Sequence, residues 1–303
     1  MISSLAEIEA LAKATEPVKT AIIAPEDHEF MLAVKDACQR GFIEPVLIGR
    51  RTIIEKAADK ANYDLDTTRI VEVTDRQRIA NTAMDMLSSG KVEMVSKGQI
   101  PTSYVYRAII ACMKARQEEA VISVQTFWDI KGCDHLVLLT DTGANISPGE
   151  NEKRAILNNA LKVMPLLGYA CPKVMELVSD SAILKDKHKH FKHEKTPIIK
   201  DKANSGTYQR LEVQVLKKVL LGDHDNFVNL NNLPHIMLMP DLNTGNMIAK
   251  LDFFIKDIVR ISCCYTSMGP VIVPSRSDLA EAIMREIIFG VALVAQHRRL
   301  TND

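Results

Sequence analysis

The sequence predicts an α/β protein of two domains, built on parallel sheet with helices on both faces. Short apolar runs alternate with segments of helical apolar spacing along much of the chain, which is the pattern of βαβ units. The 303 residues exceed the usual size of one domain. Several apolar runs also end in polar loops, and ligands of open α/β sheets bind beyond the carboxyl ends of strands.

The composition restricts the class of partner. Lys and Arg together number 38, as do Asp and Glu, so no overall positive field favours nucleic acid or lipid. Residues 1–13 include Glu7 and Glu9 and lack the apolar run of a signal peptide. No apolar stretch reaches the roughly 18 residues that span a bilayer. We expect a soluble, cytoplasmic protein with a small-molecule partner.

The first part of the chain gives four strand and helix pairs. Apolar runs predict strands at 20–24, 44–49, 70–73 and 92–95, and helical spacing predicts helices at 26–40, 51–61, 75–88 and 101–116. The strand at 92–95 leads into a polar loop that contains Lys97 and Gly98. Thr102 opens the next helix, and Arg107 lies one helical turn after Ser103, so the spacing places them on a shared face.

The middle of the chain repeats this arrangement twice. Strands are predicted at 121–124 and 136–140, followed by a loop of small and polar residues that includes Asp141 and Asn145. A helix at 151–168 and a strand at 172–178 follow. The strand at 235–239 opens into a loop with Asn243, Gly245 and Asn246, and a helix is predicted from 244 to 262. An ordinary connection in which these residues serve only backbone geometry is the alternative.

The chain closes with a strand–helix junction that favours an anion. A proline-bounded apolar run at 269–274 predicts a buried parallel strand, and 279–296 has helical spacing. Ser275, Arg276, Ser277 and Asp278 lie between them. Unpaired N–H groups at a helix start attract phosphate, and a guanidinium adds two-point hydrogen bonding. A serine that only caps the helix, with Arg276 in a surface ion pair, is equally compatible with these residues.

Metal and nucleotide sites are not predicted. The six cysteines have no CxxC spacing and resemble core residues of a protein in a reducing compartment. Three histidines, His188, His190 and His193, lie among lysines without a carboxylate cluster, which favours an exposed segment over a metal site. The loops carry neither GxGxxG nor GxxxxGK[ST].

Four separated stretches together resemble the phosphate acetyltransferase and phosphate butyryltransferase family. They are residues 95–98 with Thr102 and Arg107; residues 141–148 with 158–160 and 172–174; residues 240–246; and residues 274–278. The resemblance implies two α/β domains with a cleft between them, on the plan of isocitrate and isopropylmalate dehydrogenases. It places domain I at 1–117 plus 265–303, at the phosphate end of the site, and domain II at 118–264, with the CoA and acyl side.

The resemblance also implies an activity: exchange of acyl-CoA plus phosphate with acyl phosphate plus CoA, with CoA as a substrate, no permanently bound cofactor and a homodimer. Ser275 and Arg276 match the family's Ser-Arg motif, and Arg107 matches a second phosphate-binding arginine. In the acetyl branch the base is an aspartate seven residues after the serine, where this chain has Ala282. The Ser-Arg-Ser-Asp form is similar to the butyryl branch, so Asp278 is our candidate base, with helix capping as its alternative.

Two other functions are compatible with the sequence. The family's acidic pair between the strands near 172 and 235 is missing from residues 206–214. A non-catalytic homologue that binds acyl-CoA or a protein is therefore the alternative to an active enzyme. An oxidoreductase of the same plan would need the metal-binding aspartates and a dinucleotide loop, which we do not find.

Overall fold

A computed structural model describes residues 1–178, 208–212 and 229–302, and these residues form two compact units. One unit comprises residues 6–122 and 261–303 and is called here the Lys97 unit. The other comprises residues 1–5 and 123–260 and is called the Asp141 unit. The predicted domain boundaries, 117/118 and 264/265, differ from these by a few residues. Every helix in the described part of the chain is too short or too polar to span a bilayer.

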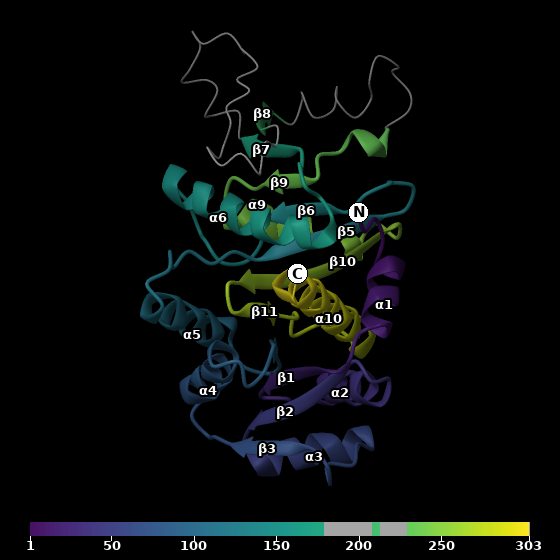
Figure 1. Cartoon of the computed structure of the whole chain (residues 1–303), viewed down its shortest axis with the longest axis vertical. Helices are drawn as coiled ribbons and strands as arrows, with labels where there is room; N and C mark the ends of the chain where they lie inside the picture. The colour runs from purple at the N-terminus through teal and green to yellow at the C-terminus, as the bar shows by residue number, and fades with distance from the viewer. Residues whose placement is uncertain (179–207, 213–228, 303) are drawn as a thin grey trace. The chain divides into compact units, whose positions relative to one another are not determined.

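The Lys97 unit has a mainly parallel sheet in the order β3-β2-β1-β4-β11-β10 (Figure 1). Its central strands are buried on both faces, which is why they appear in the sequence as continuous apolar runs. Only β10 runs antiparallel, with Cys264 opposite Val271 of β11. The strands are β1 (Val18–Ile23), β2 (Ile43–Gly49), β3 (Arg69–Glu72), β4 (Met94–Lys97), β10 (Ile258–Thr266, in this unit from residue 261) and β11 (Gly269–Ile272).

Six helices cover this sheet. Asp27 and Asp75 begin two of them by accepting the backbone N–H groups of Phe30, at 3.0 Å, and Arg78, at 2.8 Å. α10 packs on α2 and α2 on α3, while α4 packs on α5. The helices are α1 (Leu5–Lys13), α2 (His28–Gln39), α3 (Arg51–Ala61), α4 (Arg76–Ser88), α5 (Thr102–Ala115) and α10 (Ala280–Asn302).

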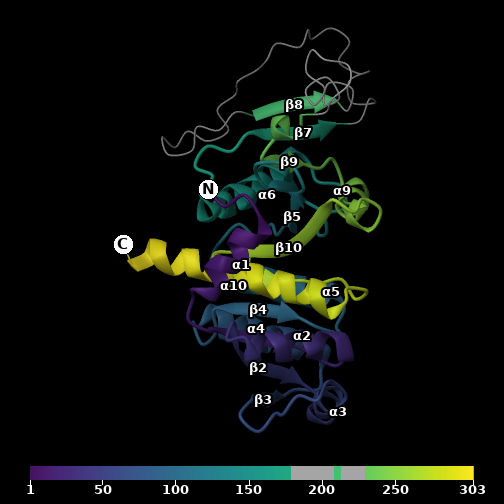
Figure 2. The same cartoon turned by 90° about the vertical axis from the view of Figure 1, so that its right-hand side faces the viewer.

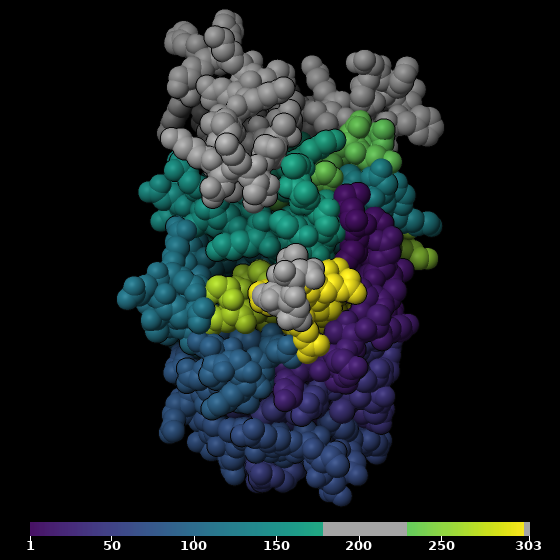
Figure 3. All heavy atoms as spheres, in the orientation of Figure 1, coloured from purple at the N-terminus to yellow at the C-terminus, as the bar shows by residue number. Residues whose placement is uncertain are grey.

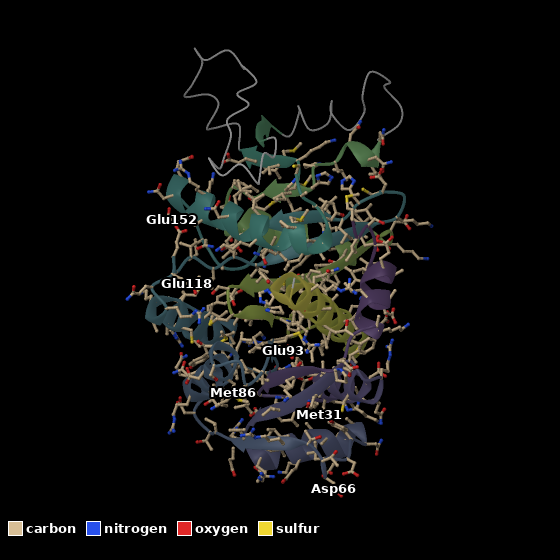
Figure 4. All side chains as sticks on the ribbon, viewed as in Figure 1. Met31, Asp66, Met86, Glu93, Glu118 and Glu152 are labelled. Atoms are coloured by element: carbon tan, nitrogen blue, oxygen red, sulfur yellow. The ribbon has the colours of Figure 1, made fainter. Side chains whose placement is uncertain are left out.

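The last helix ties the end of the chain to its beginning. The purple N-terminal helix α1 lies beside the yellow helix α10 in Figures 2 and 3. Arg298 of α10 donates two hydrogen bonds, of 2.7 and 2.6 Å, to the carboxylate of Glu93, which is labelled in Figure 4. Because Glu93 directly precedes β4, this bidentate pair joins the C-terminal helix to the sheet centre.

The Asp141 unit has a second sheet, in the order β5-β6-β9-β7-β8. β5 and β6 are antiparallel and the remaining neighbours are parallel. Its core includes Trp128, Leu139, Met175 and Met237. The elements are β5 (Gln125–Ile130), β6 (Val137–Thr140), α6 (Glu150–Val163), η1 (Met164–Leu167), β7 (Val174–Val178), β8 (Tyr208–Glu212), η2 (Leu230–Asn232), β9 (Ile236–Leu238), α9 (Leu242–Ala249) and η3 (Leu251–Phe253).

Two expected elements are wrong. The helix predicted from 244 to 262 ends at Ala249, and β10 occupies the last five residues of its second half. That half is rich in β-branched residues, which favour a strand although their apolar spacing also fits a helix. The strand predicted at 121–124 begins later, at Gln125. The histidine-rich segment 185–195 lies outside the described residues, as do residues 206–214 apart from β8.

Candidate active site

The ends of β1 and β4 meet closely in the Lys97 unit. From β1 the chain goes to β2 and β3 on one side, and β4 then returns on the other side, which makes this the switch point of the sheet. Gly98 follows β4, and a Cβ there would lie 2.3 Å from the carbonyl oxygen of Ala24, just after β1. Glycine is therefore required at 98, because any side chain would force the two strand ends apart.

Lys97 is the buried cation of this region. Its side chain is only 2% exposed, and Nζ donates to the carbonyl oxygens of Gly98, at 3.1 Å, and Ile100, at 3.5 Å. Burial, and secondly the Arg276 guanidinium, lower the pKa of Lys97 to about 8, although the nearby carboxylates of Glu286, Asp278 and Asp27 oppose this shift. A desolvated ammonium with few protein acceptors can bind an anion.

The loop after β11 is held by its own carboxylate. Asp278 is buried, and its Oδ2 accepts the backbone N–H of Ser275 at 2.8 Å, while its own N–H donates to the Ser275 carbonyl at 3.1 Å. The hydroxyls of Ser275 and Ser277 are 3.1 Å apart, and Arg276 is exposed. This arrangement fixes the loop and leaves the guanidinium open to solvent.

The serines do not cap the following helix. α10 begins at Ala280, whose N–H donates to Glu29 Oε2 of α2 at 2.9 Å. The capping alternative considered for Ser275 and Ser277 is therefore not what the structure has. Both hydroxyls lie before the helix, where a ligand could use them.

Sequence reasoning missed two acids near Lys97. Asp27 is the N-cap of α2 and follows β1, and Glu286 is buried in α10. Asp27 carried a usable signal, since an aspartate right after the first predicted strand occupies the same strand-end position as Lys97. No sequence signal pointed to Glu286, because its distance from Lys97 depends on how α10 packs.

Arg107 has local contacts in the described residues. Its Nε donates to Gln77 Oε1 of α4 at 2.8 Å, and its guanidinium carbon lies 4.6 Å from the centre of the Tyr104 ring. The side chain is exposed, and Thr102, at the start of α5, is half-buried. Arg107 is thus oriented by its own helix pair and not by a contact with the loop after β11.

In the Asp141 unit, Asp141 organises the loop after β6. Its buried carboxylate accepts the backbone N–H groups of Val124 (2.8 Å), Gly143 (3.0 Å), Ala144 (3.1 Å) and Asn145 (2.6 Å), and the side-chain amide of Asn145 at 2.7 Å. Both carboxylate oxygens are occupied by the protein. Asp141 therefore shapes the loop and is not available to a substrate in this structure.

The start of α9 packs directly on that loop. Asp241 caps α9 by accepting the N–H of Thr244 at 2.9 Å. A Cβ on Gly245 would lie 2.3 Å from the Asp141 carbonyl oxygen, and Asn246 Nδ2 donates to the Thr142 carbonyl at 3.2 Å. Asn243, in the same turn, is exposed. The structure thus brings together the residues predicted for this unit, which are Asp141, Asn145, Asn243, Gly245 and Asn246.

Comparison with known families agrees with this architecture. The family described as phosphate acetyl/butaryl transferase matches residues 74–294, which is well over half of the chain. The chain belongs to the phosphate acetyl/butyryl transferase family. The match covers the loops after β4, β6, β9 and β11, so the predicted family is confirmed, and the enzyme class is that of a phosphate acyltransferase.

Similar family members are named for both acyl branches. A phosphate butyryltransferase of Clostridium acetobutylicum is 27% identical, over 98% of this chain and 100% of that protein. A phosphate acetyltransferase of Rickettsia felis is 26% identical, over 87% of this chain and 77% of that protein. The non-catalytic alternative is not favoured by these relatives.

Two solved structures have a similar fold. A branched-chain phosphotransacylase from Enterococcus faecalis superimposes with a TM-score of 0.68 at 17% identity, covering 91% of this chain and 99% of that one. A 4-hydroxythreonine-4-phosphate dehydrogenase from Klebsiella pneumoniae gives 0.55 at 9% identity, covering 92% of this chain and 100% of that one. The predicted α/β fold class with a dehydrogenase-like plan is confirmed.

Proposed function

We propose that this protein exchanges a short acyl group between CoA and phosphate, converting acyl-CoA plus phosphate into acyl phosphate plus CoA and back. The observation that supports this most is the buried Lys97 ammonium at the end of β4, close enough to Arg276 for the guanidinium to lower its pKa. Two cations at neighbouring strand ends fit a multiply charged oxyanion such as phosphate.

The phosphate end of the reaction is assigned to the Lys97 unit. Lys97, Arg276 and Arg107 bind phosphoryl oxygens, and Ser275 holds the transferring group. Gly98 keeps the ends of β1 and β4 close together, and Thr102 supplies a hydroxyl contact. Charge develops on the carbonyl oxygen and on the phosphate as the tetrahedral transition state forms, and fixed donors stabilise it.

The acyl-CoA side is assigned to the Asp141 unit. Asn145, Asn243 and Asn246 offer polar side chains, whereas Asp141 and Gly245 keep the loop and the helix start in place. This assignment follows the division that the resemblance implies, with 118–264 as the CoA domain and 1–117 plus 265–303 as the phosphate domain. The proposal requires both sets of residues to serve one pair of substrates.

The reaction proceeds by direct transfer. In the direction of acyl-CoA synthesis a base takes the proton of the CoA thiol, and the sulfur forms a bond to the acyl carbon. The bond from that carbon to the phosphate oxygen then breaks, and phosphate leaves with the electron pair. A free thiol, with a pKa near 8.5, is only a few per cent ionised at neutral pH, so a base is needed.

An assay of CoA release tests the activity. Acetyl-CoA and butyryl-CoA are each supplied with phosphate, and turnover by the wild type is compared with Arg276→Ala. We expect turnover of both, with butyryl-CoA preferred, and at least a 100-fold loss in Arg276→Ala, as is typical of a lost oxyanion donor. Arg299→Ala, which removes an exposed arginine of α10, is the matched control. Wild-type turnover no higher than that of Arg276→Ala would refute the proposal.

Asp278 is the proposed base, and Asp278→Asn separates this role from support of the loop. An asparagine oxygen can still accept the N–H of Ser275, so the loop geometry survives while the base is lost. We expect kcat to fall by about 100-fold or more. Glu281→Gln is the control, because Glu281 is exposed and pairs with Arg285 at 2.6 Å. Unchanged kcat in Asp278→Asn would restrict Asp278 to a positioning role.

We further propose a homodimer in the cytoplasm. Five apolar side chains around the end of α9 are exposed: Met247, Leu251, Phe253, Phe254 and Ile255. Contiguous exposed apolar surface of this kind usually marks an interface. Phe254→Asp, at a side chain that is 86% exposed, should give monomers in analytical ultracentrifugation, whereas Leu279→Asp, at a side chain of the Lys97 unit that is 67% exposed, should not. A wild type that sediments as a monomer would end this part of the proposal.

A further inference from the structure

A second group of reactive side chains lies at the other end of β6 from Asp141. Cys133, Asp134 and His135 are consecutive, and their sulfur, carboxylate and imidazole donor atoms all lie within 4.8 Å of one another. The Cys133 Sγ is 3.7 Å from His135 Nδ1, which is 2.7 Å from Asp134 Oδ1. A thiol, a carboxylate and an imidazole converging in one turn are three different metal-ligand types.

From this geometry we propose that Cys133, Asp134 and His135 form a binding site for a divalent transition metal of the zinc type. Tetrahedral zinc with ordinary bond lengths places its sulfur and nitrogen ligands about 3.6 Å apart, close to the observed separation. It places nitrogen and oxygen ligands about 3.4 Å apart. The Asp134 side chain is 66% exposed and can rotate away by the small amount required.

The imidazole is already oriented as a ligand. His135 is buried, and its other nitrogen, Nε2, lies 3.0 Å from the carbonyl oxygen of Leu233. A metal-binding histidine usually donates its second N–H to such an acceptor, which fixes the ring and the tautomer. With Nε2–H held by Leu233, Nδ1 is the nitrogen that faces Cys133 and Asp134, and it becomes a ligand when the proton that it shares with Asp134 in this structure is lost.

The donor set selects the kind of ion. Thiolate and imidazole favour Zn²⁺ and Co²⁺ over Mg²⁺ and Ca²⁺, which prefer oxygen. Thiolate and carboxylate together neutralise a divalent charge, and binding releases the thiol proton and the Nδ1 proton to solvent. Cys133 is half-buried and Asp134 exposed, so an ion reaches the site from solvent and a water completes its coordination.

The site is separate from the proposed chemistry. His135 precedes β6 and Asp141 follows it, so six extended residue steps, roughly 20 Å at about 3.3 Å per residue, lie between them. A bound ion would join the β5–β6 connection to the segment before β9, since its ligand His135 also contacts the Leu233 carbonyl oxygen through Nε2, at 3.0 Å. We infer a stabilising role for the ion and none in acyl transfer.

Titration of metal-free, full-length protein with Co²⁺ tests this site. We expect one ion per chain and a thiolate-to-Co²⁺ charge-transfer band in the near ultraviolet, which added Zn²⁺ abolishes. The band is diagnostic because it requires sulfur, and the segment containing His188, His190 and His193 has no cysteine between residues 172 and 262. Co²⁺ uptake without the band would assign binding elsewhere and overturn the proposal.

Substitutions test which side chains bind the ion. Cys133→Ser removes the proposed sulfur ligand, so the charge-transfer band should disappear. Changing a residue that only hydrogen-bonds to a metal ligand lowers metal affinity by about 10–100-fold, so loss of the ligand itself should weaken Co²⁺ binding at least about tenfold. Asp134→Asn, at a side chain that is 66% exposed, should also weaken binding. Cys171→Ser, which removes an exposed cysteine of the same unit, should leave the band unchanged. A band that survives Cys133→Ser, or disappears in Cys171→Ser, would refute the assignment.

Discussion

At the scale of the residue, Lys97 is a charged group that burial removes almost entirely from water. Burial, followed by the Arg276 guanidinium, lowers its pKa to about 8 from an ordinary value of 10.5. Between these pH values the unfolded chain holds more protons than the folded protein, so the free energy of unfolding rises with pH. Relative to Lys97→Met, we expect the wild type to gain about 2 kcal/mol between about pH 7 and about pH 9.5.

Denaturant unfolding at a series of pH values measures this difference. Below pH 8 the buried ammonium of the wild type is charged, and this charge destabilises the folded protein. As the pH rises toward 10.5 the folded protein loses this charge, so the destabilisation disappears. Methionine does not titrate, so the variant shows no such change. The matched control is Lys91→Met, at an exposed lysine just before β4, whose curve should run parallel to the wild type. If the free energy of unfolding of the wild type changed with pH in the same way as that of Lys97→Met, Lys97 would not be a buried ammonium that loses its charge in this pH range.

At the scale of the element, the contact between the β6 loop and the first turn of α9 depends on the absence of a side chain. Gly245→Ala would place Cβ 2.3 Å from the Asp141 carbonyl oxygen and 3.2 Å from Thr142 Cα, both backbone atoms. We expect a loss of about 1–3 kcal/mol in the free energy of unfolding. Gly49→Ala, whose Cβ would meet neighbours no closer than 3.4 Å, should change it far less. Equal effects would show that close packing at 245 is unimportant.

At the scale of the whole molecule, the Lys97 unit is assembled from both ends of the chain. β11 pairs with β4, and α10 packs on α2. A chain ending at residue 260 would expose β4 and the apolar residues that α10 covers. We expect it to lose cooperative thermal unfolding and to aggregate, as followed by circular dichroism and size-exclusion chromatography. A chain ending at residue 299 keeps the Arg298–Glu93 pair and should unfold like the wild type; a well-folded 1–260 chain would contradict this account.

The sequence predicts those features that are local. The apolar run of β11 and the Ser275-Arg276 loop after it are recognisable because proline bounds the strand and polar residues follow. β10 was missed because its apolar residues also fit a helical period. Contacts between distant residues could not be predicted, such as Gln77 with Arg107 or Glu29 at the start of α10. The Cys133 cluster was missed because three consecutive ligands match no familiar spacing.

The place of β11 beside β4 also determines when the Lys97 unit can be completed during protein synthesis. β1 to β4 leave the ribosome early, but the partner of β4 is made only about 170 residues later. At about 5–20 residues per second, β4 waits roughly 10 to 30 s with an unpaired edge. An apolar strand edge exposed for that long invites association with other nascent chains. We therefore expect chaperones that act during translation to bind this strand.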